Sequence, residues 1–273
     1  MDFVKMEGAG NDYVYVDALR SDFPWSRAAE LAVAWSDRHF GVGGDGLIVL
    51  SKGERAPVRM TMWNLDGSRG AMCGNGLRCV AKLARDHGHV ATDRFVVETD
   101  AGDREVEVFA ADAHDPATCL VRTQMGPVVT GPAVRIEILG RQLEFVPGDA
   151  GNPHAVVFVD DVEAADVAGI GAAMQHHVAF PDGVNVEFVQ VVGPDLVRQR
   201  TFERGSGETL ACGTGAAAVA RAARQLGLVT GDEVRVELRG GLLRIQLDGT
   251  SLAIVGPART VFAGTIALPG REP

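Results

Sequence analysis

The tetrapeptide Cys73-Gly74-Asn75-Gly76 returns 139 residues later as Cys212-Gly213-Thr214-Gly215, and the residues that follow each copy favour a helix. The first predicted helix continues through 77–85 and the second through 216–226, and a glycine ends each of them. Each cysteine therefore lies at a helix N-terminus. There, unpaired backbone N–H groups and the helix dipole stabilise a thiolate, and glycines let an anion approach the backbone. The sequence thus predicts two bases, each beside an anion site.

The residues before the two cysteines correspond as well. Three landmarks precede each cysteine in the same order and at nearly the same distances. They are Asn64 and Glu203 at nine residues, Asp45 and Asn185 at 28 and 27, and Asn11 and Asn152 at 62 and 60. We interpret this as a diverged internal duplication. Two like halves facing each other would form one cleft.

Length and composition agree with this interpretation. The 273 residues suit two domains of about 100–150 residues each, and 46% apolar and 23% charged residues are ordinary for a globular protein. No long apolar stretch or signal-peptide pattern is present, so we expect a cytoplasmic protein without a membrane partner. A net charge of −10 with scattered basic residues argues against nucleic acid. The four cysteines contain no Cys-x-x-Cys pair, so their spacing predicts no metal site.

Helical and strand patterns alternate irregularly along the chain, which favours an α+β fold. The expected strands are 13–16, 47–50, 58–63, 95–99, 106–109, 120–123, 135–139, 155–159, 186–192, 196–202 and three late strands divided by Gly240-Gly241 and Asp248-Gly249. Further helices are expected over 24–40 and 162–173. The glycine-rich loop 41–46 precedes a strand rather than a helix, so we discount a dinucleotide site. The helix after Cys212 is apolar all round, which indicates burial inside a curled sheet.

Five motifs together resemble those of the diaminopimelate epimerases, over essentially the whole chain. They are Gly8-Ala9-Gly10-Asn11-Asp12, Asn64-x-Asp66-Gly67-Ser68, Cys73-Gly74-Asn75-Gly76-x-Arg78-Cys79, Gly151-Asn152-Pro153-His154 and Glu203-Arg204-Gly205-x-Gly207-Glu208-Thr209-x-Ala211-Cys212-Gly213-Thr214-Gly215. The resemblance implies two pseudo-symmetric α+β domains, each a curled mixed β-sheet around a central helix, with the active site in the cleft between them. We expect the domains at 1–117, completed by a C-terminal strand over about 258–273, and at 118–257. The resemblance also implies a homodimer.

The implied reaction converts LL-2,6-diaminopimelate to the meso form without a cofactor. Inverting a stereocentre in this way needs a base on one face of the α-carbon and an acid on the other, and one thiolate with one thiol meets that need. Cys73 and Cys212 are the expected pair, and no pyridoxal phosphate is required. The α-carboxylate would be held by backbone N–H groups at the two helix N-termini. These groups belong to Gly74, Asn75, Gly213 and Thr214.

The resemblance also assigns substrate-binding side chains in this chain. They are Asn11, Asn64, Asn152, Asn185, Glu203 and Arg204. Arg204 suits the distal carboxylate of the substrate, and His154 and Glu203 are expected to tune the thiols. Two positions depart from the family pattern: Glu7 stands where histidine is common, and Gly46 stands where some members have glutamine.

Other interpretations stay open. Cys79 and Cys119 are expected to be structural core residues, and His39, His87 and His89 to be surface or helix-cap residues. Within the enzyme class, the alternative is a racemase or epimerase of another amino acid, such as proline or hydroxyproline. Outside it, the alternatives are a thiol-disulfide redox protein using Cys73 and Cys212, or a binding module that has lost catalysis.

Overall fold

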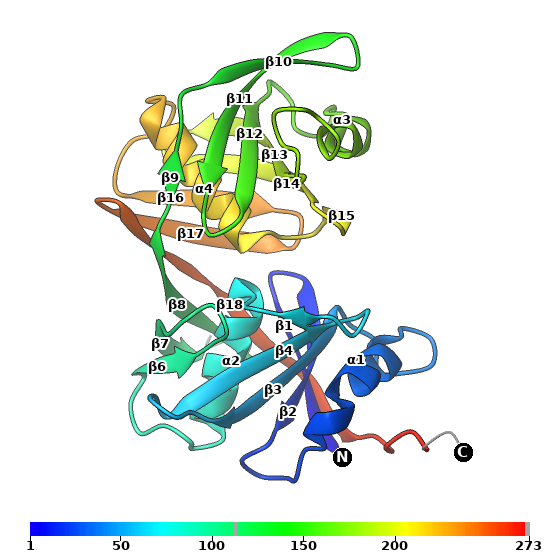
Figure 1. The fold of residues 1–273 in the computed structure, drawn as a ribbon. Helices are drawn as coiled ribbons and strands as arrows, with labels where there is room; N and C mark the ends of the chain where they lie inside the picture. The colour runs from blue at the N-terminus through cyan, green and yellow to red at the C-terminus, as the bar shows by residue number, and fades with distance from the viewer. Residues whose placement is uncertain (112–113, 271–273) are drawn as a thin grey trace. The chain divides into compact units, whose positions relative to one another are not determined.

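The structure, a computed structural model, describes residues 1–111 and 114–270. It divides into unit 1, the described residues of Met1–Gln124 and Gly256–Pro273, and unit 2, Met125–Val255. Two strands, β8 (Thr118–Pro127) and β18 (Ser251–Thr265), contribute residues to both units (Figure 1). The domain bounds expected from the sequence remain a prediction, and residues 271–273 of the expected C-terminal strand lie outside the described residues.

Unit 1 is a mixed sheet with helices on both faces. Its helical segments are η1 (Trp25–Arg27), α1 (Ala28–Ser36) and α2 (Gly74–Asp86). Its strands, besides parts of β8 and β18, are β1 (Asp2–Gly8), β2 (Asn11–Asp17), β3 (Gly46–Lys52), β4 (Val58–Asn64), β5 (Arg69–Gly70), β6 (Arg94–Glu98) and β7 (Arg104–Ala111). The pairs β2–β3 and β4–β6 are parallel, whereas β3–β4, β6–β7 and β7–β8 are antiparallel.

Unit 2 repeats this order. Its helices are α3 (Val167–Met174) and α4 (Gly213–Gln225). Its strands, besides parts of β8 and β18, are β9 (Val129–Thr130), β10 (Val134–Ile138), β11 (Arg141–Asp149), β12 (Pro153–Phe158), β13 (Asn185–Gly193), β14 (Leu196–Glu203), β15 (Gly207–Thr209), β16 (Glu233–Leu238) and β17 (Gly241–Asp248). Here β12–β13 and β14–β16 are parallel, and β13–β14, β16–β17 and β17–β18 are antiparallel. The repeated pairing supports the internal duplication, and the α+β prediction is confirmed.

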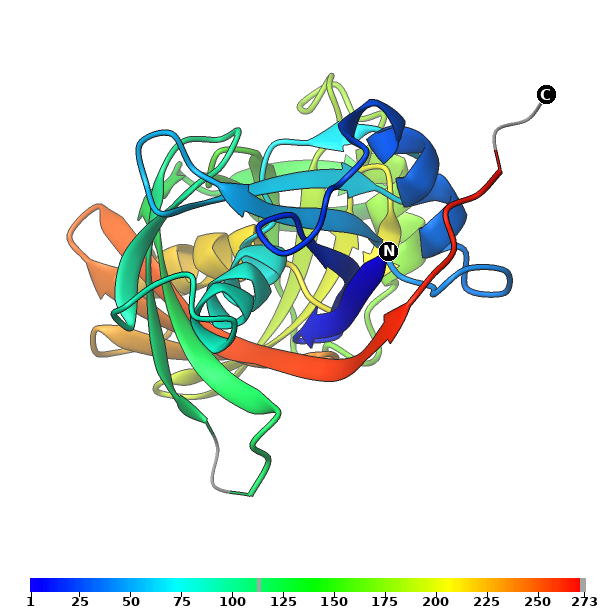
Figure 2. The same ribbon diagram turned by 90° about the horizontal axis from the view of Figure 1, so that it is seen from below.

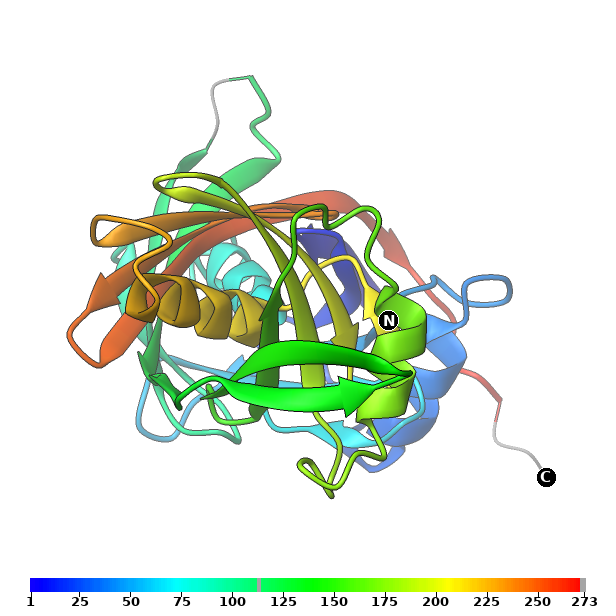
Figure 3. The same ribbon diagram turned by 90° about the horizontal axis from the view of Figure 1, so that it is seen from above.

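A central helix lies inside the curl of each sheet. Helix α2 packs against β1, β2, β3, β4 and β7 (Figure 2), and α4 packs against β9, β11, β12, β13, β16 and β17 (Figure 3). In α4 the residues from Gly215 to Ala220 are all buried, as its apolar sequence predicts. Each curled sheet therefore fixes the position of the helix whose N-terminus carries a cysteine.

Strand alternation explains why both faces of these sheets are covered. Along β2, Tyr13 and Tyr15 lie in the core around α2, whereas Val14 and Val16 lie in the core around α1. A strand that is apolar on both faces must be buried on both. The outer helices α1 and α3 complete this burial by packing on β2–β4 and on β13–β14, respectively.

Some predicted elements differ from the observed ones. Strand β11 was not predicted, because Pro147 and Gly148 lie near its end and disfavour a strand in the sequence. Helix α3 begins at Val167 rather than 162, since the Asp166 side chain caps it by accepting from the Gly169 N–H (3.0 Å). The expected return of the C-terminal strand to the first half is confirmed, as β18 pairs with β1. Among the described residues, no helix has the length and apolar character needed to cross a membrane.

Candidate active site

Cys73 and Cys212 occupy the same position in their units, at the N-cap of a central helix. Both have extended backbone angles, φ −127° and ψ 121° for Cys73 and φ −123° and ψ 110° for Cys212. Each sulfur accepts a hydrogen bond from the backbone N–H three residues on, at 3.4 Å from Gly76 and from Gly215. The N–H groups between, in the first helical turn, have no carbonyl partner within the helix. The predicted pair of helix-terminal thiols is therefore present.

A glycine in each first turn lets the helix lie directly on the sheet. A Cβ atom at Gly76 would stand 2.5 Å from Ile48 Cδ1, and one at Gly215 would stand 2.4 Å from Glu187 Oε1. Ile48 and Glu187 are themselves equivalent, since each lies 25 residues before the equivalent cysteine. The residue beneath the helix N-terminus is thus apolar in unit 1 and a carboxylate in unit 2.

Asn11 contacts the first thiol. The Cys73 thiol donates to Asn11 Oδ1 (3.1 Å), while Asn11 Nδ2 donates to Asp45 Oδ2. Asp45 is held in turn by the Asp12 N–H (3.1 Å) and by Arg38 (3.0 Å). The amide of Asn11 is therefore oriented with its oxygen toward sulfur. Asp45 was a landmark of the duplication, but its role as the partner of Asn11 was missed.

Tyr13 is the unit 1 counterpart of His154, since each lies two residues after the equivalent asparagine. It is 5% exposed, and burial raises the pKa of its phenol well above the usual value, with Cys73 and then Asp45 adding to the rise. Tyr13 therefore places a neutral hydroxyl group near the Cys73 thiol. Sequence reasoning did not single it out, because alternating aromatics in a strand indicate core.

The other predicted side chains of unit 1 bond to near neighbours. Asn64, the last residue of β4, donates to Ser68 Oγ (3.0 Å). Asn75 is buried, and its Oδ1 accepts from Arg78 Nη2 (2.8 Å). Arg78 is fully buried and its Nε also donates to Pro257 O (3.0 Å), so this pair anchors the first turn of α2. What Asn75 and Gly74 can offer a ligand is their backbone N–H groups.

The two departures from the family pattern have structural reasons. The Glu7 carboxylate accepts from the Gly10 N–H (2.9 Å) and so closes the turn before Asn11. Gly46 has φ +155°, and a Cβ there would stand 2.1 Å from the backbone oxygen of Trp63. No side chain fits at Gly46 in this backbone, so the lost glutamine contact follows from the conformation of the loop.

Cys212 lies in a more acidic and more enclosed setting than the helix N-terminus alone predicts. It is 5% exposed, and burial raises the pKa of its thiol well above the usual value, with the charges of Glu203 and Glu187 adding to the rise. Thr214 Oγ1, at 3.5 Å, and the Gly215 N–H oppose this only in part. These surroundings favour the protonated thiol at Cys212, against the stabilisation of a thiolate that the helix N-terminus alone supplies.

Glu187 organises the polar core behind Cys212. It is fully buried and accepts from His154 Nδ1 (2.8 Å), from Gln199 Nε2 (2.7 Å) and from Thr201 Oγ1. The other ring nitrogen of His154, Nε2, lies 3.0 Å from Asn152 Oδ1. The predicted residues His154 and Asn152 thus form one chain with Glu187. Sequence reasoning missed Glu187, although a charged residue at an inward strand position was a usable signal.

The remaining predicted residues of unit 2 flank β14. Burial raises the pKa of the Glu203 carboxyl, against hydrogen bonding from Thr209. Asn185 joins two backbone segments, because Nδ2 donates to Pro153 O (3.1 Å) and Oδ1 accepts from the Arg204 N–H (2.9 Å). Arg204 is exposed, and its Nη1 donates to Asp182 O (3.0 Å). A guanidinium has five N–H donors, so Arg204 can also bind an anion.

Solved structures with low sequence identity share this fold. A Bacillus anthracis phenazine biosynthesis protein of the PhzF family aligns with a TM-score of 0.75 at 15% identity, covering 98% of this chain and 99% of that chain. A hydroxyproline epimerase from Agrobacterium vitis, solved with bound trans-4-hydroxy-L-proline, aligns with a TM-score of 0.70 at 18% identity, covering 99% of this chain and 93% of that chain. At these identities the likeness concerns the fold alone.

Sequence comparisons go further. The family model described as diaminopimelate epimerase matches residues 3–131 and 148–261. The diaminopimelate epimerase of Leptospira biflexa is 42% identical over 284 residues, covering 98% of this chain and 99% of that protein. The diaminopimelate epimerase of Xylella fastidiosa is 44% identical over 282 residues, covering 96% of this chain and 95% of that protein. On this basis the chain belongs to the diaminopimelate epimerase family.

Proposed function

We propose that this protein epimerises LL-2,6-diaminopimelate to meso-diaminopimelate without a cofactor. Cys73 acts as the thiolate base and Cys212 as the thiol acid, on opposite faces of one α-carbon. The observation that carries the proposal is the repeated N-cap cysteine, each with a hydrogen bond to its sulfur at 3.4 Å. The names of the curated relatives support the substrate.

The two roles follow from a difference between equivalent positions. Burial favours the protonated thiol at Cys212, and the carboxylates of Glu203 and Glu187 add to that effect. At the equivalent positions of unit 1 stand Ile48 and Asn64, which carry no charge. The duplication therefore supplies two thiols, and the deeper burial of Cys212 together with the carboxylates at these two positions makes that thiol the acid.

Stabilisation of the carbanion comes from the backbone. Removing the α-proton moves charge onto the oxygens of the neighbouring carboxylate. The N–H groups of Gly74, Asn75, Gly213 and Thr214 stand in first helical turns, where the helix dipole also favours negative charge. Donors fixed in a helix need no reorganisation during the reaction.

The distal end of the substrate carries a second amino-acid group, which we assign to polar side chains. Arg204 would bind the distal carboxylate with a planar pair of hydrogen bonds, and Glu203 would bind the distal ammonium. Asn11, Asn64, Asn152 and Asn185 complete the set. Lysine lacks the distal carboxylate and proline lacks the whole distal amino-acid group, so neither can make these hydrogen bonds, and we expect strong preference for diaminopimelate over both.

The proposal includes the cytoplasmic location and the homodimer that the family resemblance implies. Light scattering on the purified protein measures the oligomeric state directly. A monomer at working concentration with full activity would exclude the homodimer from the mechanism.

Proton exchange in deuterated water tests the chemistry across a panel of amino acids. We expect exchange at the α-carbon of diaminopimelate and much less with lysine or proline. Cys73→Ala and Cys212→Ala should each abolish epimerisation, whereas the matched control Cys119→Ala should retain it. Near-normal turnover by either active-site variant would exclude the two-thiol mechanism, and thiol-disulfide exchange without α-proton exchange would favour the redox alternative.

A further inference from the structure

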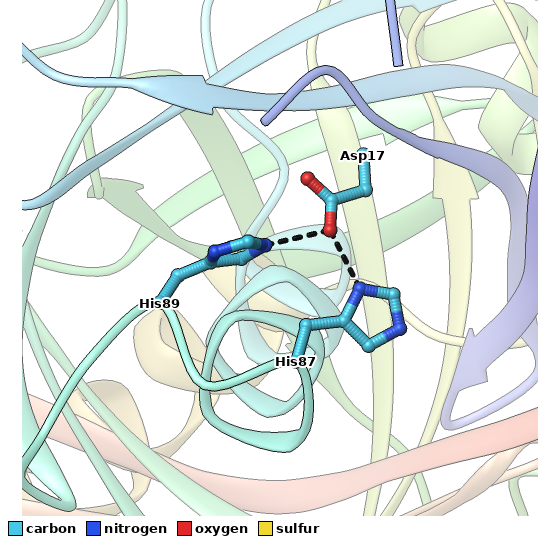
Figure 4. A group of neighbouring side chains, drawn as sticks. All are labelled: Asp17, His87 and His89. Carbon is cyan, nitrogen blue, oxygen red and sulfur yellow. Dashed lines mark hydrogen bonds and ion pairs between the residues drawn. The ribbon is translucent and has the colours of Figure 1, made fainter. Parts of the chain in front are cut away.

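Two histidines and an aspartate meet in unit 1, away from the thiol. Asp17 is the last residue of β2, His87 is the C-cap of α2, and His89 follows two residues later (Figure 4). The sequence had indicated only surface or cap roles for the histidines. His87 is indeed a cap, but both rings point at the same carboxylate, 70 and 72 residues earlier in the chain.

The geometry of this cluster is convergent. Asp17 Oδ2 lies 2.6 Å from His87 Nδ1 and 2.6 Å from His89 Nε2. The two nitrogens and the oxygen all lie within 4.8 Å of one another. The three side chains are 7%, 22% and 16% exposed for Asp17, His87 and His89, respectively. The cluster is therefore enclosed by protein on most sides but still reached by solvent.

We propose that Asp17, His87 and His89 bind a divalent transition-metal cation of the zinc type. Two imidazole nitrogens and one carboxylate oxygen are a ligand set that zinc accepts, with a fourth position open to water. The cation would replace the N–H protons that now join both rings to Oδ2. Ligand atoms around tetrahedral zinc stand about 3.3 Å apart, so the rings need to move back by less than about 1 Å.

Neighbouring groups favour this site on balance. The other carboxylate oxygen, Asp17 Oδ1, accepts from the Leu19 N–H (3.0 Å), which fixes Oδ2 toward the rings. The C-terminal carbonyls of α2 attract a cation at this end of the helix. Arg20 opposes it, with Nε 3.7 Å from Asp17 Oδ2 and Nη2 donating to His87 O (2.8 Å). The Arg20 side chain is 53% exposed, so it can move into solvent.

The cation would act as a structural clamp. Strand β2 begins at Asn11 and α2 begins after Cys73, and these two residues are in contact at one end. Both elements extend about 20 Å from there, which brings Asp17 and His87 together at the other end. A metal at Asp17 would therefore tie together the far ends of the strand and helix that position the thiol, without entering the chemistry.

Calorimetric titration with Zn²⁺ tests the proposal. The protein used carries Cys73→Ala and Cys212→Ala, which removes thiols that also bind zinc, and this parent should bind one equivalent. His87→Asn and His89→Gln keep an amide N–H near the position of each ring nitrogen but remove the metal ligand. We expect each to weaken binding by at least about 100-fold. Arg20→Gln should tighten binding, because it removes the competing charge.

A matched control is His39→Gln, which changes an exposed histidine outside the cluster. It should leave the affinity unchanged. Urea unfolding with and without Zn²⁺ gives an independent measure, since a ligand that binds only the folded state raises the unfolding midpoint. The proposal is overturned if the parent shows no stoichiometric site, or if the two cluster variants bind as the His39 variant does.

Discussion

Glu187→Gln tests the origin of the difference between the two thiols. The substitution removes a buried negative charge beneath the first turn of α4. The carboxylate lies so close to the helix that a Cβ atom at Gly215 would stand 2.4 Å from Glu187 Oε1. It keeps the size of the side chain. We expect two separable effects, one on stability and one on the pH profile.

The stability effect follows from the hydrogen bonds of the carboxylate. Glu187 accepts from His154, Gln199 and Thr201, whereas a glutamine has one acceptor oxygen and turns an NH₂ group toward the remaining donors. At least one bond to a charged acceptor is lost, which is worth about 1.5–3 kcal/mol. The free energy of unfolding should therefore fall by about 2 kcal/mol, measured by urea denaturation.

The effect on pH dependence has a definite sign. The Glu187 charge helps to raise the pKa of Cys212, so its removal lowers that pKa. Epimerisation that uses Cys212 as the acid declines as pH rises through this pKa, and the alkaline limb of kcat/KM should move to lower pH. Glu237→Gln is the control, because Glu237 is exposed and pairs with Arg198 at 2.9 Å. An alkaline limb that stays in place or moves upward in Glu187→Gln would refute the reasoning.

Three further predictions concern other features. Burial raises the pKa of Cys79 to about 12, whereas a thiol in the unfolded chain has a pKa of about 8.5. The stabilisation that comes from this difference is fully present below about pH 8.5 and is lost as pH rises toward about 12. Cys79→Ala should therefore flatten the alkaline fall in unfolding free energy by up to about 1.4 kcal/mol per pH unit, and equal slopes in urea unfolding would contradict this. Gly46→Ala should lower the free energy of unfolding by more than about 2 kcal/mol in the same assay, because the new Cβ would stand 2.1 Å from a backbone oxygen. The control Gly140→Ala should lower it less, because Gly140 also has a positive φ, +71°, but has open space around its Cβ position. Asp45→Asn frees the amide of Asn11 to turn its NH₂ toward the Cys73 sulfur, where it would stabilise the thiolate and make it a weaker base. The rate of α-proton exchange should then fall about tenfold, with unchanged circular dichroism, and an unchanged rate would show that Asp45 does not orient Asn11.

Much of the fold could be predicted because its determinants are local or repeated. The N-cap cysteines, the glycines that end the helices and the alternating strands all act over a few residues. The duplication then indicated two halves of like structure. Strand β11 was not predicted because Pro147 and Gly148 have poor strand propensity. Its pairing with β10 and β12 outweighs that propensity, and this pairing exists only in the folded protein.

The thiol settings were less predictable, because they depend on residues that meet only after folding. The helix N-terminus at Cys212 favours a thiolate, but near-complete burial raises the pKa of this thiol, and two carboxylates from β13 and β14 add to the rise. Asp17 likewise meets His87 and His89 across a separation of about seventy residues. The spacing His-x-His was visible in the sequence, but the strand end that completes the cluster was not.

Pairing between β1 and β18 has a consequence for how the chain folds during synthesis. Strand β1 pairs with β2 and, in the register Asp2↔Thr265, with the C-terminal part of β18. The strands of unit 2 come from one continuous stretch, 125–255, whereas the sheet of unit 1 lacks a member until residue 265 has been made. At about 5–20 residues per second, a ribosome takes on the order of 10 s to translate that intervening stretch. The unit that carries Cys73 is therefore the first to be started and the last to be completed.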